Sequence, residues 1–387
     1  AGLSDRGRLL ARVMTLNRLI APASEHAMPD WISGTALADI LGVDLAILRE
    51  DALYRNLDRL WVCREEVEKG LAERERHLFS LDGTIYLYDL TSTYFEGKCE
   101  QNPQARRGYS RDGRPDCKQV VVGLVVNRDG FPVAHEVFEG NRADRDTVED
   151  MLGSLEGRVG SERGATVVVD RGMAYPENLE SIMARGYHYI VATRQSERSA
   201  WLDEYEADGW EEVLRETSVT NPAQKKSRIR VKKAVGEGET LVLCLSEERA
   251  TKDRAIREAH ERHLVSDLTR LEERIRSGRL KAPAKIHQAI GRIRERYPRV
   301  ARYYEIDCDG ASLSWAERTE KKAVAESLDG CYLLRTDRKD LGADEIWRIY
   351  SLLSRAEAAF RAMKSPLMER PIFHQLQHRV QAHIFLC

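Results

Sequence analysis

Apolar residues recur every three or four positions in the stretch from Asp340 to Lys364, which is the spacing of one face of an α-helix. These positions are Ile346, Tyr350, Leu353, Phe360 and Met363. Neither Gly nor Pro occurs from Ala343 to Lys364, so the pattern predicts one continuous helix. Glu357 falls on the same face. A carboxylate there is costly unless a metal, a proton or an ion pair compensates for it, and an ion pair with Arg361 is the simple alternative to a functional role.

The N-terminal residues 1–80 carry helical patterns and predict a separate helical domain. Within it, a short amphipathic helix ending near Leu41, a turn at Gly42 and a second helix from Leu45 to Leu60 are typical of a helix-turn-helix. This pattern favours DNA binding by the domain. Any small helical hairpin would produce the same pattern, so the alternative stays open.

From residue 81 to residue 195 the pattern changes to short apolar runs, which predict strands. The first run, around Asp89, is apolar on both faces and is expected at the centre of a sheet. Two further runs, separated by residues 128–130, predict a hairpin. After a helix, another buried strand ends in Asp170. Sites gather at the carboxyl ends of such strands, although a helix-capping aspartate is the ordinary alternative.

Residues 196–329 interrupt this alternation and predict an inserted α+β domain. Two strands are followed by a charged helical hairpin from residue 251 to residue 298. A heptad-like apolar stripe indicates two packed helices, at Leu264, Leu268, Leu271 and Ile275. The sheet domain resumes over residues 330–387 with one more strand and the helix described first.

Composition narrows the class of protein. The chain has 387 residues and a formal net charge of −2, and no apolar run reaches the roughly 18 residues of a membrane span. Seven scattered cysteines without a CxxC pair indicate free thiols in a reducing cytoplasm. We expect His374, His378 and His383 to be packed or solvated, because no Cys or carboxylate lies at matching intervals. The sequence ends inside an apolar run, as we expect of a truncated chain.

Basic residues concentrate locally despite the negative total. One run without acids comprises Lys225, Lys226, Arg228, Arg230, Lys232 and Lys233, and residues 270–302 hold eleven Lys and Arg against three Glu. Such runs either contact DNA phosphates or form solvated faces, and both interpretations stay open.

Three acids far apart in sequence stand at the ends of two predicted strands and on a helix: Asp89, Asp170 and Glu357. The element order is that of a ribonuclease-H-like core, an α/β mixed sheet with flanking helices, in which these acids converge. Clusters of carboxylates suit Mg²⁺ or Mn²⁺. Two such ions about 3.5–4 Å apart support an in-line phosphodiester displacement.

The sequence resembles the DDE transposases of bacterial insertion sequences, in the branch with a Tyr-x2-Arg-x3-Glu-x6-Lys signature. The resemblance covers residues from about 85 to the end and is carried by YDLTSTYFEG, FEGNRADRDT, VVVDRGM, YSLLSRAEAAFRAMKS and QHRVQAHIFLC. Tyr350, Glu357 and Lys364 occupy signature positions, whereas Leu353 stands at the Arg position. Either Arg355 or Arg361 could take over that residue's contact with phosphate.

The resemblance implies a cytoplasmic bacterial protein that binds double-stranded DNA as a homodimer, cleaves it at terminal inverted repeats and transfers the strand into target DNA. It implies that Asp89, Asp170 and Glu357 hold the metal ions and that Tyr350 and Lys364 contact phosphate. Arg361 and the basic run at 225–233 are further candidates for DNA contact.

Two rival functions remain. A ribonuclease-H-like nuclease or resolvase without strand transfer would use the same acids. An inactive, truncated transposase would bind DNA only. A glycosidase also uses paired carboxylates, but it would explain neither the third acid nor the basic runs.

Overall fold

The computed structural model describes residues 2–45, 48–79, 84–215, 227–236, 238–309 and 312–387. The chain divides into two compact units. The first comprises residues 1–192, 335–341 and 345–387, and the second comprises residues 193–334 and 342–344.

The sheet of the first unit has the strand order β3-β2-β1-β4-β5. Its strands are β1 (Ile85–Tyr94), β2 (Gln119–Asn127), β3 (Pro132–Glu139), β4 (Thr166–Val169) and β5 (His188–Ala192). β1 pairs antiparallel with β2 and parallel with β4, and β5 continues parallel to β4. The tight turn between β2 and β3 closes at Gly130, whose φ of +93° favours glycine. The predicted α/β, ribonuclease-H-like sheet is therefore confirmed.

Helices cover this sheet because its strands are apolar on both faces. Tyr86, Tyr88 and Leu90 of β1 pack in one core with residues of α6 (Val148–Val159) and α7 (Pro176–Ala184). Side chains alternate along a strand, so Asp89 points to the opposite face of the sheet. There α14 (Ser354–Lys364) contacts β1 and β2.

The single helix predicted for residues 340–364 is wrong. The chain forms two helices, α13 (Ala343–Ser351) and α14, separated by a tight turn. The hydroxyls of Ser351 and Ser354 donate to the carbonyls of Arg348 and Ser351, at 2.7 and 2.8 Å. The backbone here bonds from residue i to i+3, as in Leu353 N–H to Tyr350 O. Serine hydroxyls compete in this way with helical hydrogen bonds, and no Gly or Pro is needed to end a helix.

The N-terminal segment is helical, as predicted, and belongs to the first unit. Its helices are α1 (Asp5–Ile20), α2 (Met28–Ser33), α3 (Leu37–Leu41), α4 (Glu50–Val62) and α5 (Arg64–Phe79). Buried leucines of α4 pack in one core with α1 and with α15 (Gln377–Leu386).

The helix-turn-helix expected within this segment differs from the structure. Gly42 does end α3 in the left-handed conformation. The next helix begins at Glu50 rather than Leu45, so α3 and α4 are further apart in sequence than the three or four residues typical of the motif. Ile40, an apolar residue of α3, is 78% exposed.

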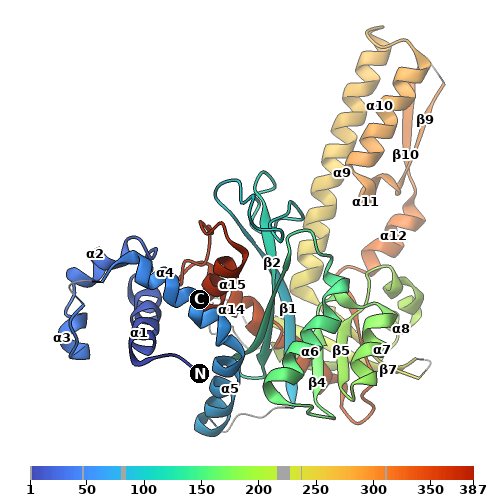
Figure 1. Ribbon diagram of the computed structural model, residues 1–387. Coiled ribbons are helices and arrows are strands. Elements are labelled where there is room, and N and C mark those ends of the chain that lie inside the picture. The colour runs from blue at the N-terminus through green and yellow to red at the C-terminus, as the bar shows by residue number, and fades with distance from the viewer. Residues whose placement is uncertain (1, 46–47, 80–83, 216–226, 237, 310–311) are drawn as a thin grey trace. The chain divides into compact units, whose positions relative to one another are not determined.

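The second unit contains the predicted α+β elements. Its strands are β6 (Glu211–Arg215), β7 (Ser227–Val235) and β8 (Thr240–Ser246), with β11 (Cys331–Thr336) beside β8. The predicted hairpin is confirmed as α9 (Glu247–Arg276) and α10 (Pro283–Arg296), which lie side by side in Figure 1. Its predicted stripe packs against Ile286, Ile290 and Ile293. The remaining elements are α8 (Leu202–Glu206), α11 (Pro298–Ala301), β9 (Tyr304–Cys308), β10 (Leu313–Glu317) and α12 (Thr319–Ser327).

Two further findings concern the cysteines and the helices of the described residues. All seven cysteines are free thiols. Among the helices that the structure describes, none combines the length and the apolar character needed to cross a bilayer.

Candidate active site

Asp89 and Asp170 lie on adjacent parallel strands at the same level of the sheet. Tyr88 of β1 is the register partner of Val169 of β4, and the two aspartates follow these residues. Neighbouring strands are about 4.8 Å apart. Asp170 stands at the N-terminal position of a short 3-10 helix, Arg171–Met173, but its side chain makes no capping hydrogen bond. The capping alternative is therefore not realised, and this exposed carboxylate remains available.

Glu357 lies in the first turn of α14, the helix that contacts β1. Its side chain is exposed, which corrects its expected position on the buried stripe. Ala356, Phe360 and Met363 form the buried face, and Glu357 lies beside it. The expected alternative partner, Arg361, forms no ion pair with Glu357 among the described residues. The carboxylate thus faces solvent at the edge of the packed face.

The three carboxylates influence one another. Burial, together with the negative charges of Asp170 and Glu357, raises the pKa of Asp89 to about 7. The Leu90 amide, which donates to Asp89 Oδ1 at 2.7 Å, opposes the shift, as does the charge of Arg111. Desolvated carboxylates that repel one another favour a proton or a bound cation. Their chemistry, oxygen donors only, fits Mg²⁺.

A basic residue that sequence reasoning missed stands beside these acids. Arg111 Nη2 lies 2.8 Å from both carboxylate oxygens of Asp144, and the Arg111 backbone N–H donates to Ser92 Oγ at 2.9 Å. Asp144 in turn lies against Gly172, where an added Cβ would come within 3.1 Å of its Oδ2. Residues 100–118 have no apolar periodicity, so the sequence indicated only a surface loop.

Residues 80–387 match a protein-family model described as transposase DDE domain. The chain belongs to this family. No curated protein matches it.

Solved transposase structures resemble this DDE-domain chain at low identity. In the synaptic complex of piggyBac transposase with hairpin DNA, the match has 8% identity and a TM-score of 0.44, and covers 99% of this chain and 64% of that chain. The Mos1 transposase paired-end complex with left transposon end gives 12% identity and a TM-score of 0.21, covering 49% and 60%. The chain thus spans less than two thirds of these relatives, and at such identities the likeness concerns the fold alone.

Lys364 of the transposase signature is bound within the protein. Its Nζ lies 2.6 Å from the carbonyl oxygen of Ser92 and 2.9 Å from Asp112 Oδ1, and Arg370 also pairs with Asp112. Only 9% of the Lys364 side chain is exposed. Burial lowers the lysine's pKa, against the opposing effect of Asp112. Its ammonium therefore joins α14 to β1, and phosphate contact by this residue stays a prediction.

The remaining signature positions lie on α13 and in the turn before α14. Tyr350 is half-buried, and Leu353, at the position of the signature Arg, is buried with 9% exposure. Of the two possible replacements, Arg355 pairs with Asp129 at 3.6 Å, whereas Arg361 is exposed on α14.

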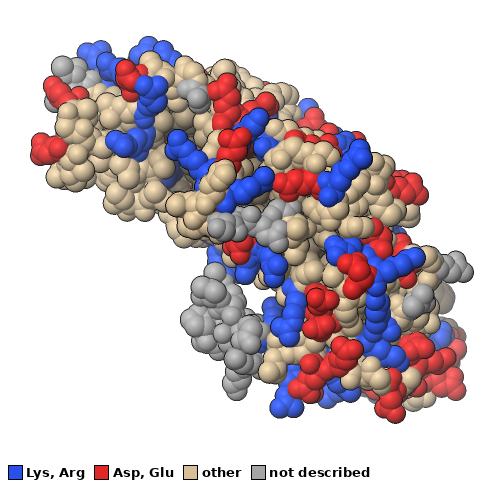
Figure 2. All heavy atoms as spheres, turned by 90° about the horizontal axis from the view of Figure 1, so that it is seen from below, with Lys and Arg blue, Asp and Glu red and all other residues tan. Residues whose placement is uncertain are grey.

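The basic run of the second unit has acidic partners that the sequence did not indicate. Arg228 lies 3.3 Å from Glu212, and Lys232 Nζ lies 2.7 Å from Glu204. These acids come from β6 and α8, so a run free of acids in sequence is not free of them in space. On the face shown in Figure 2, basic and acidic side chains are intermixed.

The rest of that run is only partly described. Arg230 stacks over Trp210 at 5.7 Å from the ring centroid, and Lys233 is exposed. Lys225 and Lys226 lie outside the described residues. DNA contact by this run stays a prediction.

The C-terminal histidines have a carboxylate neighbour after all. Ligand atoms of Glu25, His374 and His383 lie within 4.8 Å of one another. Glu25 comes from the loop after α1, too far away in sequence for interval reasoning to find. Arg18 lies 3.7 Å from Glu25 and donates to His383 Nδ1 at 3.2 Å. The Arg18 guanidinium supplies positive charge here, and His374 and His383 are packed with it in a polar network.

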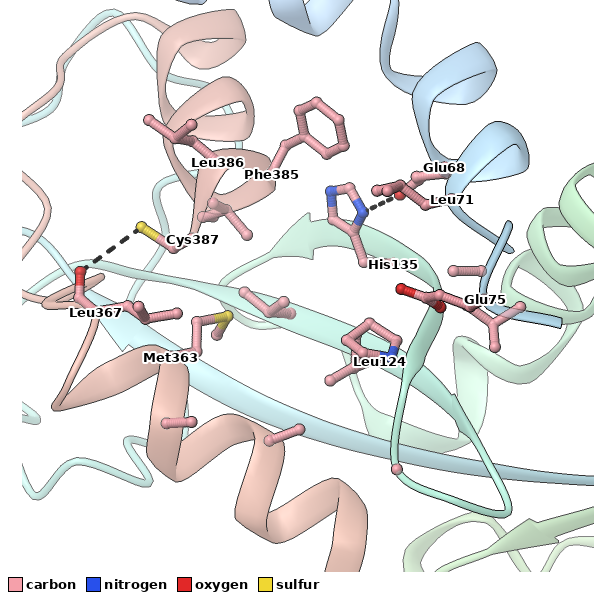
Figure 3. Close-up of a pocket in the computed structure, with 18 residues that line it drawn as sticks. Glu68, Leu71, Glu75, Leu124, His135, Met363, Leu367, Phe385, Leu386 and Cys387 are labelled. Carbon is pink, nitrogen blue, oxygen red and sulfur yellow. Dashed lines mark hydrogen bonds and ion pairs between the residues drawn. The ribbon is translucent and has the colours of Figure 1, made fainter. Parts of the chain in front are cut away.

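A cavity of about 440 Å³ in the first unit is a poor candidate for the chemistry (Figure 3). Its lining is mainly apolar and includes Leu71, Val122, Leu124, Met363 and Phe385. The main polar groups are Glu75 and a Glu68 carboxylate paired with His135. None of the three candidate metal ligands lines it.

Proposed function

We propose that this chain is a DNA transposase whose residues Asp89, Asp170 and Glu357 hold two Mg²⁺ ions. The supporting observation is the electrostatic convergence of three carboxylates from β1, β4 and α14, each without a cationic side chain bonded to it in the described part of the chain. The family of the chain supports the same reaction class. The proposed reaction is cleavage at the ends of a mobile element, followed by strand transfer.

The residues have separable roles in this reaction. When bound, two divalent ions would polarise the reacting phosphate and activate the attacking oxygen, and Mn²⁺ should substitute for Mg²⁺. The Leu90 amide holds one oxygen of Asp89 and fixes the direction of the other. Asp170 has no capping bond to lose, and Glu357 is exposed at the beginning of its helix. All three can therefore accept a cation without breaking an existing ion pair.

The proposed partners are terminal inverted repeats, target DNA and a second copy of the chain bound to the same DNA. Tyr350, Arg361 and Lys364 are the proposed phosphate contacts near the site. The basic run from Lys225 to Lys233 is proposed as a further contact with the DNA backbone. The proposed setting is the bacterial cytoplasm.

Glu357→Gln tests the metal site because glutamine keeps the shape and removes the charge. We expect Mg²⁺-dependent nicking of end-containing duplexes to fall at least about a hundredfold, with DNA affinity nearly unchanged. Glu177→Gln is the matched control, since Glu177 is an exposed carboxylate in the first turn of α7. Nicking at the wild-type rate by Glu357→Gln would show that Glu357 is not a ligand.

The products separate the proposed function from its rivals. Joined molecules of element end and target DNA indicate a transposase. Nicked ends without joined products indicate a nuclease or resolvase, and binding without cleavage in Mg²⁺ and Mn²⁺ indicates a protein that only binds DNA.

A further inference from the structure

The signature that this chain resembles carries an Arg four residues before Glu357, and here that position is Leu353. Leu353 is buried, so it belongs to the packing of α14. Arg355 is engaged by Asp129 at the hairpin between β2 and β3. The signature position therefore carries no basic residue, so the phosphate contact falls either to the exposed Arg361 of α14 or to a residue of another element.

Arg111 lies between the two segments that carry the aspartates. Its backbone is bonded to Ser92, three residues after Asp89 on β1. Its guanidinium is bonded to Asp144, which lies against Gly172, two residues after Asp170. The positive charge of Arg111 also acts on Asp89 directly. Both anchors therefore place a guanidinium at the mouth of the carboxylate site.

The Arg111 guanidinium has N–H donors that Asp144 does not engage. Only Nη2 is bonded to Asp144, although both carboxylate oxygens accept from it. Within the described part of the chain, Nε and Nη1 of Arg111 have no hydrogen-bond partner. Neither atom is among the buried polar atoms without a partner, and 25% of the side chain is exposed. A guanidinium offers five N–H donors in a planar fork that matches a phosphate.

Charge also favours this role. Three carboxylates and one phosphodiester carry four negative charges, which two divalent ions would neutralise. The ion pair of Arg111 with Asp144 adds no net charge to this sum. When the phosphate is attacked, further negative charge develops on its nonbridging oxygens. A preorganised donor beside them stabilises that state more than the ground state.

We propose that Arg111 binds the nonbridging oxygens of the reacting phosphate and replaces the signature Arg that is absent at position 353. This inference rests on the proposed function of the carboxylate site. Asp144 then acts as a positioning residue that orients the guanidinium.

The test compares single-turnover nicking by Arg111→Ala, Arg111→Lys and Arg114→Ala on an inverted-repeat duplex. Arg114 is the matched control, because it lies on the same loop and pairs with Asp116 at the surface. We expect Arg111→Ala to lose about 10²–10³ in rate with duplex affinity changed less than about threefold. Arg111→Lys should recover part of the rate, because a lysine supplies charge without the fork. Arg114→Ala should nick like the wild type.

Rescue by lysine separates this role from a merely structural one, because a lysine restores positive charge beside the phosphate without restoring the bidentate contact with Asp144. A loss that Arg111→Lys does not relieve and that accompanies lost duplex affinity would overturn the inference.

The same assay distinguishes this inference from the function on which it rests. Full activity of Arg111→Ala beside an inactive Glu357→Gln would overturn the role of Arg111 alone. A loss confined to Arg361→Ala would assign the phosphate contact to α14 and overturn it too. If Glu357→Gln also nicks normally, the proposed function itself fails.

Discussion

Two carboxylates of the first unit, the half-buried Asp89 and the buried Glu68, show pKa shifts in opposite directions. Burial acts to raise the pKa of both. At Glu68 the hydrogen bonds and charges of His135 and Arg158 outweigh burial and lower the pKa, with Arg158 Nε only 2.6 Å away. At Asp89 the neighbouring charges are mainly negative, and the pKa rises to about 7.

This difference separates a structural carboxylate from a candidate ligand. Glu68 is satisfied by the protein itself and stabilises the packing of α5 against β3 and α6. Asp89 is held in place by one amide, and no cationic side chain of the described residues is bonded to it. Burial alone therefore does not identify a site; burial combined with like charge does.

The largest effect on stability is expected from Glu68→Gln. The change leaves the Arg158 guanidinium, with 6% of its side chain exposed, without its counter-charge. Breaking a buried pair in this way costs about 3–5 kcal/mol. Urea unfolding at pH 7 measures it, with Glu73→Gln, exposed on the same helix, as a control expected within about 0.5 kcal/mol. Wild-type stability of Glu68→Gln would remove the contrast with Asp89.

An effect of opposite sign, smaller at each step of pH, is expected at Asp89 without metal. The folded state keeps the Asp89 proton up to about pH 7, whereas the unfolded state releases it near 3.8. The folded state thus binds more protons, so stability falls as pH rises between these values, by at most about 1.4 kcal/mol per pH unit. Asp89→Asn should abolish this fall and Mg²⁺ should reduce it, as urea unfolding from pH 4 to pH 8 would measure. No difference between Asp89→Asn and wild type would contradict a raised pKa.

The smallest effect is expected for the basic run from Lys225 to Lys233, where acidic partners determine how much each lysine contributes to DNA binding. Lysines that neutralise phosphates contribute about 0.9 each to the salt slope of duplex binding. Lys232→Gln should change the slope by less than this, because Glu204 already holds its ammonium at 2.7 Å. Glu204→Gln should release the lysine and steepen the slope, and the double change Lys225→Gln with Lys226→Gln should flatten it. Equal slopes in all variants would assign the run to a solvated face.

Much of the fold follows from apolar periodicity. Local apolar patterns correctly predicted the strands around Asp89 and Asp170, the β-hairpin between them and the long helical hairpin of the second unit. The adjacency of Asp89 and Asp170 follows from the parallel pairing of β1 with β4, although Asp89 lies in the middle of β1 and not at its expected place near the strand end.

The remaining features depend on contacts that sequence spacing does not encode. Arg111 stands in a loop without periodicity, and its partners come from β1 and from the segment before α6. The break before α14 comes from two serine hydroxyls in an otherwise unbroken apolar pattern. The partner of Lys364 is a loop aspartate 252 residues away in sequence.

Because α14 packs on β1, the distance from Glu357 to Lys364 along the helix can be compared with the distance from Asp89 to Ser92 along the strand. Seven helical residues advance about 10.5 Å and return to nearly the same side of the helix, after two turns. Three strand residues, from Asp89 to Ser92, advance about 10 Å. At one end of this matching length the charge of Glu357 acts on Asp89. At the other end the Lys364 ammonium donates to the Ser92 carbonyl. The six residues between the signature Glu and Lys therefore act as a ruler: adding one would turn the lysine by about 100° and detach it from the strand.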